Sequence, residues 1–283
     1  MAKIKVLIAG VNGQVGSAVK ELLSTNEKFE IYGYNHSEFD ISSRNSVRNI
    51  IYELIPDVIV NAAAMTNVDL CETEQNKAYN INSLGARNLM QAANEINAHL
   101  IHLSTDYVFD GEKKSPYTEF DIPNPQSVYA TSKLGGDNEI LIYDKSTVLR
   151  VAWVFGNKKG DFFSWVLDGV KNNTIKSLIG DAVCTPTYSN DIAYVINYVI
   201  LNRIFGLINV ANTGETTRLE MGNIFLKKLG IDVELNSITT QSLNRPAKRP
   251  LYSSLETNTL NIVTGISMRN WQDALEEHIE KFK

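Results

Sequence analysis

The first half of the chain alternates between two hydrophobic patterns. Short runs rich in β-branched residues are followed by segments in which apolar residues recur every three or four positions, as they do along one face of a helix. These patterns predict strands at 3–9, 29–34, 57–60, 99–103 and 147–154, and helices at 14–24, 43–55, 74–96 and 128–143. Because strands that alternate with helices form βαβ units, we predict an α/β fold, a doubly wound and Rossmann-like parallel sheet with helices on both faces.

Beyond Phe155 the alternation becomes less regular. The spacing still predicts helices at 188–201, 219–229 and 270–283, and a strand at 207–210. We therefore predict a first domain over residues 1–155 and a smaller C-terminal lobe over residues 156–283, some elements of which return to the first domain.

One segment of the first half fits neither pattern. Residues 110–127 are mostly polar and contain Pro116, Pro123 and Pro125. A connection of this length inside a compact domain is uncommon unless it has a task, so we predict a functional loop.

The composition restricts the possible partners. There are 27 Lys and Arg against 32 Asp and Glu, which gives a net charge of −5 and an isoelectric point of about 5.5. Nucleic-acid binding favours a basic surface, so no nucleic-acid partner is expected. The chain carries no secretion signal and no run of 18 apolar residues, so we expect a cytoplasmic protein that does not enter a membrane. Cys71 and Cys184 match no metal-binding spacing and are expected to be free thiols.

A glycine-rich turn follows the first predicted strand, with the spacing G-x-x-G-x-x-G. Gly10 permits a tight turn, Gly13 lets a phosphate approach the backbone, and Gly16 lets the helix pack closely on the sheet. The N–H groups at the start of the next helix then face a pyrophosphate. The turn predicts a dinucleotide site in the first domain, with contacts from Gly10, Asn12, Gly13, Gln14, Val15 and Gly16.

The end of the second strand bears on the choice of dinucleotide. A carboxylate there would bind the ribose 2′-hydroxyl of NAD, but the sequence continues with Asn35 and His36. The amide can bond a hydroxyl and the imidazole can approach a phosphate, so we predict NADPH as the cofactor, with NADH also accepted. Asp40 and Ile41 are candidates for a place near the adenine, and an ordinary turn is the alternative for them.

A tyrosine and a lysine four residues apart stand on the helix predicted at 128–143. Tyr129 and Lys133 share one face of that helix, and a cation beside a phenol favours the phenolate, which lowers the pKa of the tyrosine. Such a phenol can donate a proton to a carbonyl oxygen while a hydride reaches the carbon. Thr105 ends the preceding strand at the same edge of the sheet and can supply a hydroxyl to the same oxygen.

These motifs, in this order, resemble the extended short-chain dehydrogenase/reductase superfamily, and within it the dTDP-4-dehydrorhamnose reductase family. The resemblance spans most of the chain. It rests on Gly10–Gly16, 61–69 (NAAAMTNVD), 104–111 (STDYVFDG), 117–119 (YTE), Tyr129–Lys133, 150–154 (RVAWV) and 249–253 (RPLYS).

The resemblance implies a role for several residues. Tyr129 would be the proton donor, Lys133 would tune it and hold the cofactor ribose, and Thr105 would be the hydroxyl partner. The cofactor would also lie against Ala62, Ala63 and Ala64, and the sugar nucleotide would be contacted by Asp69, Asp106, Tyr107, Trp153 and Arg249. Core packing is the alternative for Trp153, and a turn or cap is the alternative for Asp106.

The basic cluster at 245–249 suits phosphate oxygens, with a solvated surface loop as the alternative. Some members of the family hold a metal at an acidic dimer contact. The glycine turn here contains no glutamate to match it, so we expect no required metal and either a monomer or a homodimer.

One local difference favours reduction over elimination. In the related sugar-nucleotide dehydratases the threonine is followed by Asp-Glu, whereas here Thr105 is followed by Asp106 and Tyr107. Elimination needs an acid and a base near the leaving group, and the tyrosine replaces one of them. The implied reaction is reduction of the C4 ketone of dTDP-4-dehydro-L-rhamnose to dTDP-L-rhamnose, a precursor of cell-surface polysaccharide.

Two alternatives stay open at the level of sequence. The first is another NAD(P)-dependent sugar-nucleotide reductase or an epimerase, which would have the same fold and catalytic pair. The second is a non-catalytic, NADP-binding regulatory subunit of methionine adenosyltransferase. The presence of Thr105, Tyr129 and Lys133 argues against the second, because a binding module has no need of a tuned phenol.

Overall fold

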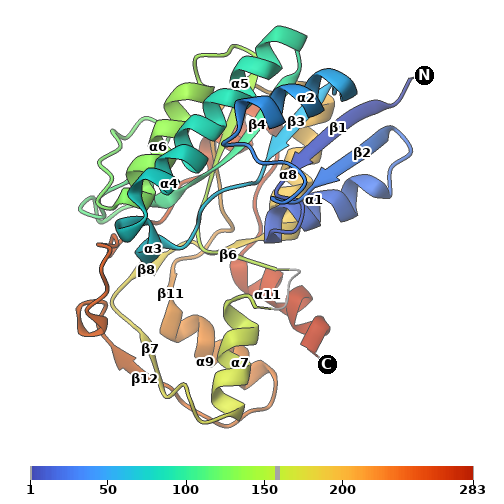
Figure 1. The fold of residues 1–283 in the computed structure, drawn as a ribbon. Helices are drawn as coiled ribbons and strands as arrows, with labels where there is room; N and C mark the ends of the chain where they lie inside the picture. Colours follow the sequence, from blue (N-terminus) through green and yellow to red (C-terminus); the bar gives the residue numbers. More distant parts are fainter. Residues whose placement is uncertain (1, 157–159, 283) are drawn as a thin grey trace.

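A six-stranded parallel sheet forms the centre of the molecule (Figure 1). The computed structural model describes residues 2–156 and 160–282. The strand order is β10-β5-β4-β3-β1-β2, so the chain winds in both directions from β1, and the predicted doubly wound fold is confirmed. The strands are β1 (Ile4–Ala9), β2 (Phe29–Tyr34), β3 (Val58–Asn61), β4 (His99–Thr105), β5 (Ser146–Val151) and β10 (Gly206–Val210).

The sheet is buried on both faces, which is why its strands are almost continuously apolar. One face is covered by α1 (Gln14–Ser24) and α8 (Ser189–Asn202), which contribute Val19, Leu23 and Ile196 to a core cluster. The other face is covered by α2 (Arg44–Leu54), α5 (Gly85–Ile96) and α6 (Val128–Ile140), whose cluster includes Ile51 and Leu89. Figure 1 shows these two helical layers on either side of the strands.

The register brings the carboxyl ends of the central strands together. Ala9 lies opposite Asn61, and Asn61 lies opposite His102. Thr105, at the end of β4, lies opposite Val151, at the end of β5. The segments that follow β1, β3, β4 and β5 therefore meet at one edge, where doubly wound sheets bind their ligands.

The continuous helix predicted at 74–96 is wrong in its middle. The structure has α4 (Gln75–Tyr79), a single π-helical turn η1 (Asn80–Leu84) and then α5. The turn directs Asn82 and Ser83 toward α6, where the Asn82 amide donates to Ser132 Oγ (3.0 Å) and Ser83 Oγ donates to the Ser132 carbonyl (2.7 Å). Periodicity alone does not reveal this bulge, because only the contacts with α6 make it favourable.

Other predicted elements differ at their ends. The short helix α3 (Val68–Thr73) was not predicted, and the strand expected to run to residue 154 stops at Val151. Two residues later Trp153 has a positive φ of 37°, after which the chain forms the short strand β6 (Val154–Phe155). The helix expected at 270–283 is α11 (Trp271–Ile279), followed by the 3₁₀ turn η4 (Glu280–Phe282), and residue 283 lies outside the described residues.

A smaller lobe lies below the sheet in Figure 1. Its core is formed by α7 (Phe162–Lys171), α9 (Arg218–Lys228) and α11, which pack around Phe163, Phe225 and Trp271. Short strands frame it: β7 (Ser177–Ile179), β8 (Val183–Cys184), β9 (Thr187–Tyr188), β11 (Thr216–Thr217) and β12 (Asn236–Ile238). Between these segments, α8 and β10 return to the sheet. The division at residue 155 stays a prediction.

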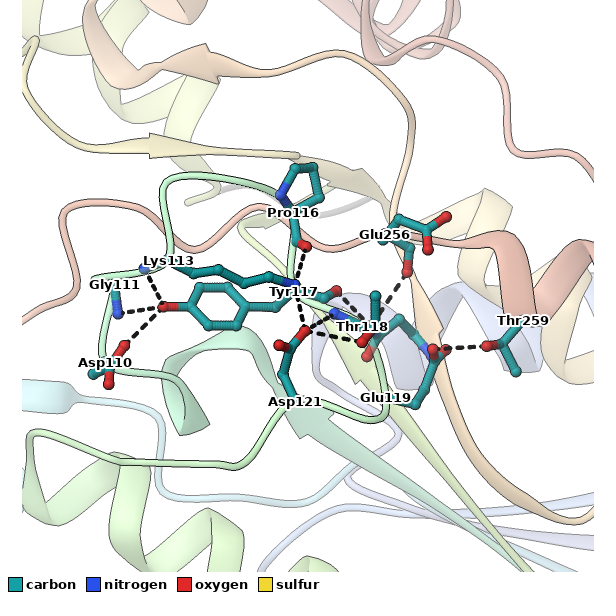
Figure 2. Close-up of polar contacts among 11 residues, drawn as sticks. Asp110, Gly111, Lys113, Pro116, Tyr117, Thr118, Glu119, Asp121, Glu256 and Thr259 are labelled. Carbon is teal, nitrogen blue, oxygen red and sulfur yellow. Dashed lines mark hydrogen bonds and ion pairs between the residues drawn. The ribbon is translucent and has the colours of Figure 1, made fainter.

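The loop at 110–127 is held by its own polar side chains (Figure 2). The Tyr117 hydroxyl accepts from the N–H groups of Gly111 and Lys113 and donates to Asp110 Oδ1 (2.8 Å). Asp121 Oδ2 accepts from the Thr118 N–H (2.7 Å) and pairs with Lys113 Nζ (2.6 Å). The loop is therefore an ordered structure without regular secondary structure.

The same loop ties the end of the chain to the sheet. The Tyr117 N–H donates to the Ser254 carbonyl (2.7 Å), and the Glu256 N–H donates to the Tyr117 carbonyl (2.9 Å). Glu119 accepts from the Asn209 N–H in β10 (2.6 Å) and from Thr259 Oγ1 (2.8 Å), at the start of α10 (Asn258–Thr264). The segment around residues 250–256 thus has a fixed position relative to the sheet edge.

No helix in the described ranges 2–156 and 160–282 is long and apolar enough to cross a membrane.

The contact between α6 and the π-helical turn gives a first prediction. A Cβ at Gly136 would lie 2.4 Å from the Asn82 carbonyl oxygen. Gly136→Ala should therefore destabilise the protein by about 1–3 kcal/mol, although alanine normally stabilises a helix interior relative to glycine. Thermal and urea unfolding measure the change, with the exposed Asn138→Ala on the same helix as control. A G136A variant as stable as the wild type would contradict the tight packing.

Candidate active site

A cavity of about 450 Å³ opens at the carboxyl edge of the sheet. It lies where the strand order reverses beside β1, the place expected for a ligand in this topology. The lining includes Gly13, Gln14, Val15, Ala62, Ala64, Thr105, Asp106, Tyr107, Tyr129, Lys133 and Trp153 from the sequence-based predictions. Thr66, Val68, Leu103, Ser104, Val151, Val154 and Arg218 also line it and were not predicted.

The glycine turn is shaped by close backbone contacts. Gly10 has a φ of 79°, and a Cβ there would lie 2.7 Å from the Ala63 nitrogen. A Cβ on Gly16 would lie 2.3 Å from the Gly10 carbonyl oxygen, so α1 can start directly against the turn only with glycine at this position. These two glycines and Ala63 stand behind the cavity wall, and Asn12 is exposed beside it.

The start of α1 can accept an anion. Gly13 is the N-cap residue and provides no side-chain hydrogen bond, and the first turn contains no acidic residue. The N–H groups of that turn have no partners within the helix and carry the positive end of its dipole. Within the described part of the chain, Gln14 Oε1 is buried without a hydrogen-bond partner. This donor-rich, glycine-lined cradle fits the pyrophosphate of a dinucleotide.

Asp40 and Ile41 lie away from this cavity. The Asp40 carboxylate accepts from Ser42 N (3.0 Å) and Ser42 Oγ (2.7 Å), which is a turn-forming contact. Ile41 is buried in the core against Gly85. These positions match the ordinary-turn alternative, and a place near the adenine stays a prediction.

Helix α6 carries the tyrosine and lysine to the cavity. Its N-cap residue Ser127 accepts from the Ala130 N–H, so Tyr129 lies in the first turn, half-buried and edge-to-face with Tyr107. Lys133 lies one turn deeper and is only 2% exposed. Its Nζ donates to the Leu103 carbonyl (2.6 Å). Burial lowers the pKa of Lys133 to about 8.

The expected lowering of the tyrosine pKa is wrong for this structure. Burial raises the pKa of Tyr129 above its ordinary value, the hydrogen bond with Thr105 opposes the rise, and the negative charge of Asp106 adds to it. The ammonium of Lys133 is directed to the Leu103 carbonyl and not to the phenol oxygen. The phenol therefore stays protonated at neutral pH, which suits a group that donates a proton.

A buried carboxylate orients the threonine. Thr105 Oγ1 donates to Asp106 Oδ1 (3.0 Å) and accepts from the Tyr107 N–H (3.2 Å). Asp106 Oδ2 accepts from Ser253 Oγ (2.6 Å) and from Cys184 Sγ (3.5 Å). Three side chains thus bind this carboxylate, which is 2% exposed, and burial raises its pKa to about 6. The geometry gives Asp106 a task in positioning Thr105, and a contact with the sugar stays a prediction.

A second cavity of about 700 Å³ adjoins the first and shares Tyr107, Trp153 and Arg218 with it. Its walls also include Phe162 and Trp165 from α7. Trp153 has the positive φ that only a few bulky residues adopt, and such strain is found mostly at functional sites. Its half-buried indole therefore lies at the junction of the cavities and not in a closed core.

The two predicted substrate ligands Asp69 and Arg249 bind each other. The guanidinium donates to Asp69 Oδ1 (3.0 Å) and Oδ2 (2.8 Å). This pairing with Arg249 lowers the pKa of Asp69, against the opposing effect of burial. The pair joins the lobe to the first turn of α3. Arg249 lines only the larger cavity, and Asp69 lines neither.

Arg218 is the cation that sequence reasoning missed. Its guanidinium stacks over Trp153 (4.1 Å) and Phe162 (4.6 Å), and it lines both cavities. No carboxylate of residues 2–156 or 160–282 forms an ion pair with it. In sequence it is simply the first residue of α9 after the cap Thr217, so only its position between the cavities identifies it.

A helix that delivers a tyrosine and a lysine to the ligand-binding edge of a doubly wound sheet is the arrangement of the short-chain dehydrogenases/reductases, a class of NAD(P)-dependent oxidoreductases. Comparisons with known proteins define the family. The family described as "RmlD substrate binding domain" matches residues 4–283.

Two curated relatives match along nearly their whole length. The dTDP-4-dehydrorhamnose reductase of Aggregatibacter actinomycetemcomitans is 35% identical over 285 residues, with 96% of this chain and 97% of that protein covered. The spore coat polysaccharide biosynthesis protein SpsK of Bacillus subtilis (strain 168) is 32% identical over 278 residues, with coverages of 98% and 97%. In addition, the crystal structure of dTDP-4-dehydrorhamnose reductase from Bacillus anthracis str. Ames in complex with NADP has a TM-score of 0.95 and 31% identity, and 99% of both chains is covered.

The chain therefore belongs to the dTDP-4-dehydrorhamnose reductase family, and the predicted resemblance is confirmed.

The part of the chain that the structure describes contains no group of three or more His, Cys, Asp or Glu that could hold a metal ion. That no metal is required stays a prediction.

The buried carboxyl of Asp106 gives a prediction about pH. With a folded-state pKa of about 6 against an ordinary value of 3.8, the folded protein binds more protons than the unfolded chain between about pH 4 and 6. The contribution of Asp106 to stability therefore falls as the pH rises through this window. Asp106→Asn removes this titration. Relative to D106N, the wild type should lose about 2–3 kcal/mol of unfolding free energy between pH 4 and pH 7.

Urea unfolding at several pH values measures this difference. Asp144→Asn, at an exposed position, is the control variant. A difference between wild type and D106N that stays constant from pH 4 to pH 7 would contradict the raised pKa.

Proposed function

We propose that the protein reduces the C4 ketone of dTDP-4-dehydro-L-rhamnose to dTDP-L-rhamnose, with NADPH as the preferred reductant and NADH also accepted. One observation carries the proposal. Tyr129, Thr105 and Lys133 line the same cavity as Gly13 and Gln14 of the glycine turn, and this cavity adjoins a second, basic and aromatic cavity. Family membership supports the same reaction.

The cofactor is assigned to the smaller cavity. The N–H groups at Gln14 and Val15, in the first turn of α1, are suited to the pyrophosphate, and Ala62 and Ala64 give a wall without bulky side chains. The matching Bacillus anthracis structure, which is in complex with NADP, supports this assignment. When bound, NADPH supplies the hydride that reaches C4.

The residues of the chain handle the proton and the orientation of the ketone. Tyr129 is a protonated phenol on the wall of this cavity, so it can donate its proton to the C4 oxygen as that oxygen gains negative charge. Thr105 aligns the Tyr129 hydroxyl, and Asp106 fixes the threonine. Lys133 provides a positive charge below the phenol, which stabilises the phenolate left after proton donation.

The nucleotide part of the substrate is assigned to the larger cavity. Arg218 is a cation with aromatic support and without a carboxylate partner among the described residues, so it is free to bind diphosphate oxygens. Arg245 lines the same cavity, whereas Arg249 is already paired with Asp69. The half-exposed Trp165 offers a surface on which the base can stack.

We further propose that the protein acts in the cytoplasm, as a monomer or a homodimer, on a small-molecule substrate and without a nucleic-acid partner. The acidic charge balance and the biosynthetic relatives support this assignment.

The direct test is oxidation of NADPH, followed by absorbance at 340 nm, with dTDP-4-dehydro-L-rhamnose generated in the assay. We expect rapid oxidation and dTDP-L-rhamnose as the product. NADPH consumption with a different product would assign the enzyme to another keto sugar. Cofactor binding without any oxidation of NADPH would favour the regulatory-subunit alternative.

Tyr129→Phe tests the proton donor. The variant keeps the ring and its packing on Tyr107 but loses the hydroxyl. We expect kcat to fall by about 10²-fold or more, with NADPH affinity within about threefold of the wild type, because only the transition-state interaction is removed. Steady-state kinetics and fluorescence titration measure the two quantities. Turnover like that of the wild type would remove Tyr129 from the mechanism.

Arg218→Gln tests the substrate assignment. Loss of a charge-assisted bond to a diphosphate costs about 1.5–3 kcal/mol, so KM for the sugar nucleotide should rise by about 10- to 100-fold. The affinity for NADPH should change much less. Arg203→Gln, at an exposed position that ends α8 and lines neither cavity, is the matched control. An unchanged KM for the sugar nucleotide would place the diphosphate elsewhere.

A further inference from the structure

Lys133 has a second neighbour that the proposed mechanism does not use. The ring nitrogen Nε2 of His102 lies 3.2 Å from Lys133 Nζ. His102 stands on β4, three residues before Thr105, and is 1% exposed. The lysine is thus held between a carbonyl oxygen, that of Leu103, and an imidazole. A buried histidine at this point either joins β4 to β3 through its contact with Asn61, or it positions the lysine.

The hydrogen bonds fix the tautomer of this imidazole. Asn61 Oδ1 accepts from the Ala63 N–H (3.2 Å), which directs the amide nitrogen Nδ2 toward His102 Nδ1 (2.9 Å). Nδ1 is then the acceptor, so the neutral ring carries its proton on Nε2. Burial and the nearby Lys133 hold the pKa of His102 well below 6.5, so the ring is neutral. An N–H group therefore points at the lysine.

An N–H group facing Nζ has a chemical consequence. An ammonium cannot accept that hydrogen bond, whereas the lone pair of a neutral amine can. The Leu103 carbonyl accepts a hydrogen bond from the amine as well as from the ammonium. The contact with His102 therefore favours the amine over the ammonium, in the same direction as the burial of Lys133.

The charges around the pair are few and well defined. From α6, Asp137 Oδ1 lies 4.0 Å from His102 Nε2, and Asp137 Oδ2 pairs with Arg150 Nε of β5 (3.3 Å). Asp137 favours the ammonium form of Lys133, and the pairing with Arg150 moderates that effect. From β3 the neighbour is the uncharged Asn61.

We infer that His102, oriented by Asn61, is a positioning residue for Lys133: its Nε2–H fixes the ε-amino group against the Leu103 carbonyl and favours the neutral amine. The inference rests on the proposed function for its kinetic consequences. The effect of His102 on the charge of the Lys133 amino group can be tested without a substrate. Lys133 then changes its charge near neutral pH, so the stabilisation of the Tyr129 phenolate depends on pH.

Two substitutions separate the contact with Lys133 from the contact with Asn61. His102→Gln places an amide near the position of Nε2, where its carbonyl oxygen can accept from a Lys133 ammonium. His102→Asn places an amide near the position of Nδ1, which keeps the partner of Asn61 and leaves Lys133 without one. His99 on the same strand is buried and bonds Thr147 Oγ1 (2.8 Å), so His99→Gln and His99→Asn are matched controls.

The first measurement is the titration of Lys133 by NMR of protein labelled with ¹³C at lysine Cε, with the resonance assigned by its loss in Lys133→Met. In the wild type Lys133 should titrate with a midpoint near pH 8. In H102Q its midpoint should move to higher pH by about one unit, a tenfold change in the ionisation constant. The His99 variants should leave it in place. A Lys133 midpoint that is the same in the wild type and H102Q would overturn the inference, whatever the substrate proves to be.

The second measurement is the pH profile of NADPH oxidation. We expect H102Q to retain kcat within about threefold at pH 7. The alkaline limb of its kcat/KM profile should move to higher pH, by the same amount as the NMR midpoint. H102N should lose kcat by about tenfold or more because Lys133 is no longer fixed. Thermal unfolding verifies that each variant is folded. The reverse order, with H102N active and H102Q inactive, would show that His102 serves only to join β4 to β3 and would overturn the inference.

Discussion

The burial of Lys133 below the carboxyl edge of the sheet is the constraint on which the site depends. A buried cation is costly unless its donors are satisfied, and here the Leu103 carbonyl accepts from Lys133 and Asp137 favours its charged form. Helix α6 must therefore lie close to β4, and the glycines at 135 and 136 let it pack tightly against the neighbouring π-helical turn, since a Cβ at either position would meet Ser83 or Asn82. Once α6 is so placed, Tyr129 is carried one turn nearer the surface, to the cavity wall.

Polar contacts between residues far apart in sequence join the smaller lobe to the sheet and its helices. Ser253 binds the carboxylate of Asp106, and Arg249 binds Asp69 through two hydrogen bonds. The loop at 110–127 holds the same C-terminal segment against β10 (Figure 2). Because these contacts end at Asp106, which binds Thr105, and at Asp69 on α3, the position of the lobe and the geometry of the catalytic edge are coupled.

The electrostatics of the site separate two tasks. Burial keeps the phenol of Tyr129 protonated and lowers the pKa of Lys133 to about 8, so desolvation adjusts both the proton donor and its neighbouring cation. Arg218, in contrast, keeps its charge at the junction of the two cavities and is supported by aromatic rings. The residues assigned to the reacting ketone thus line the smaller cavity, and those assigned to the nucleotide part of the substrate line the larger one.

The sequence by itself determined the doubly wound sheet, the glycine turn, and the order in which Thr105, Tyr129 and Lys133 reach its edge. These features depend on local periodicity and on chain order, since parallel strands necessarily align their carboxyl ends. It could not determine the π-helical turn, which exists only because Asn82 and Ser83 bind α6.

Only the tertiary structure decided which polar groups lie beside one another. It paired Asp69 with Arg249, directed Asp106 to Ser253, and placed His102 against Lys133. It also reversed the expected direction of the Tyr129 pKa shift, because spacing reports a shared helix face but not the depth of burial. Desolvation and long-range pairing depend on packing between distant segments, and a linear pattern of residues contains neither.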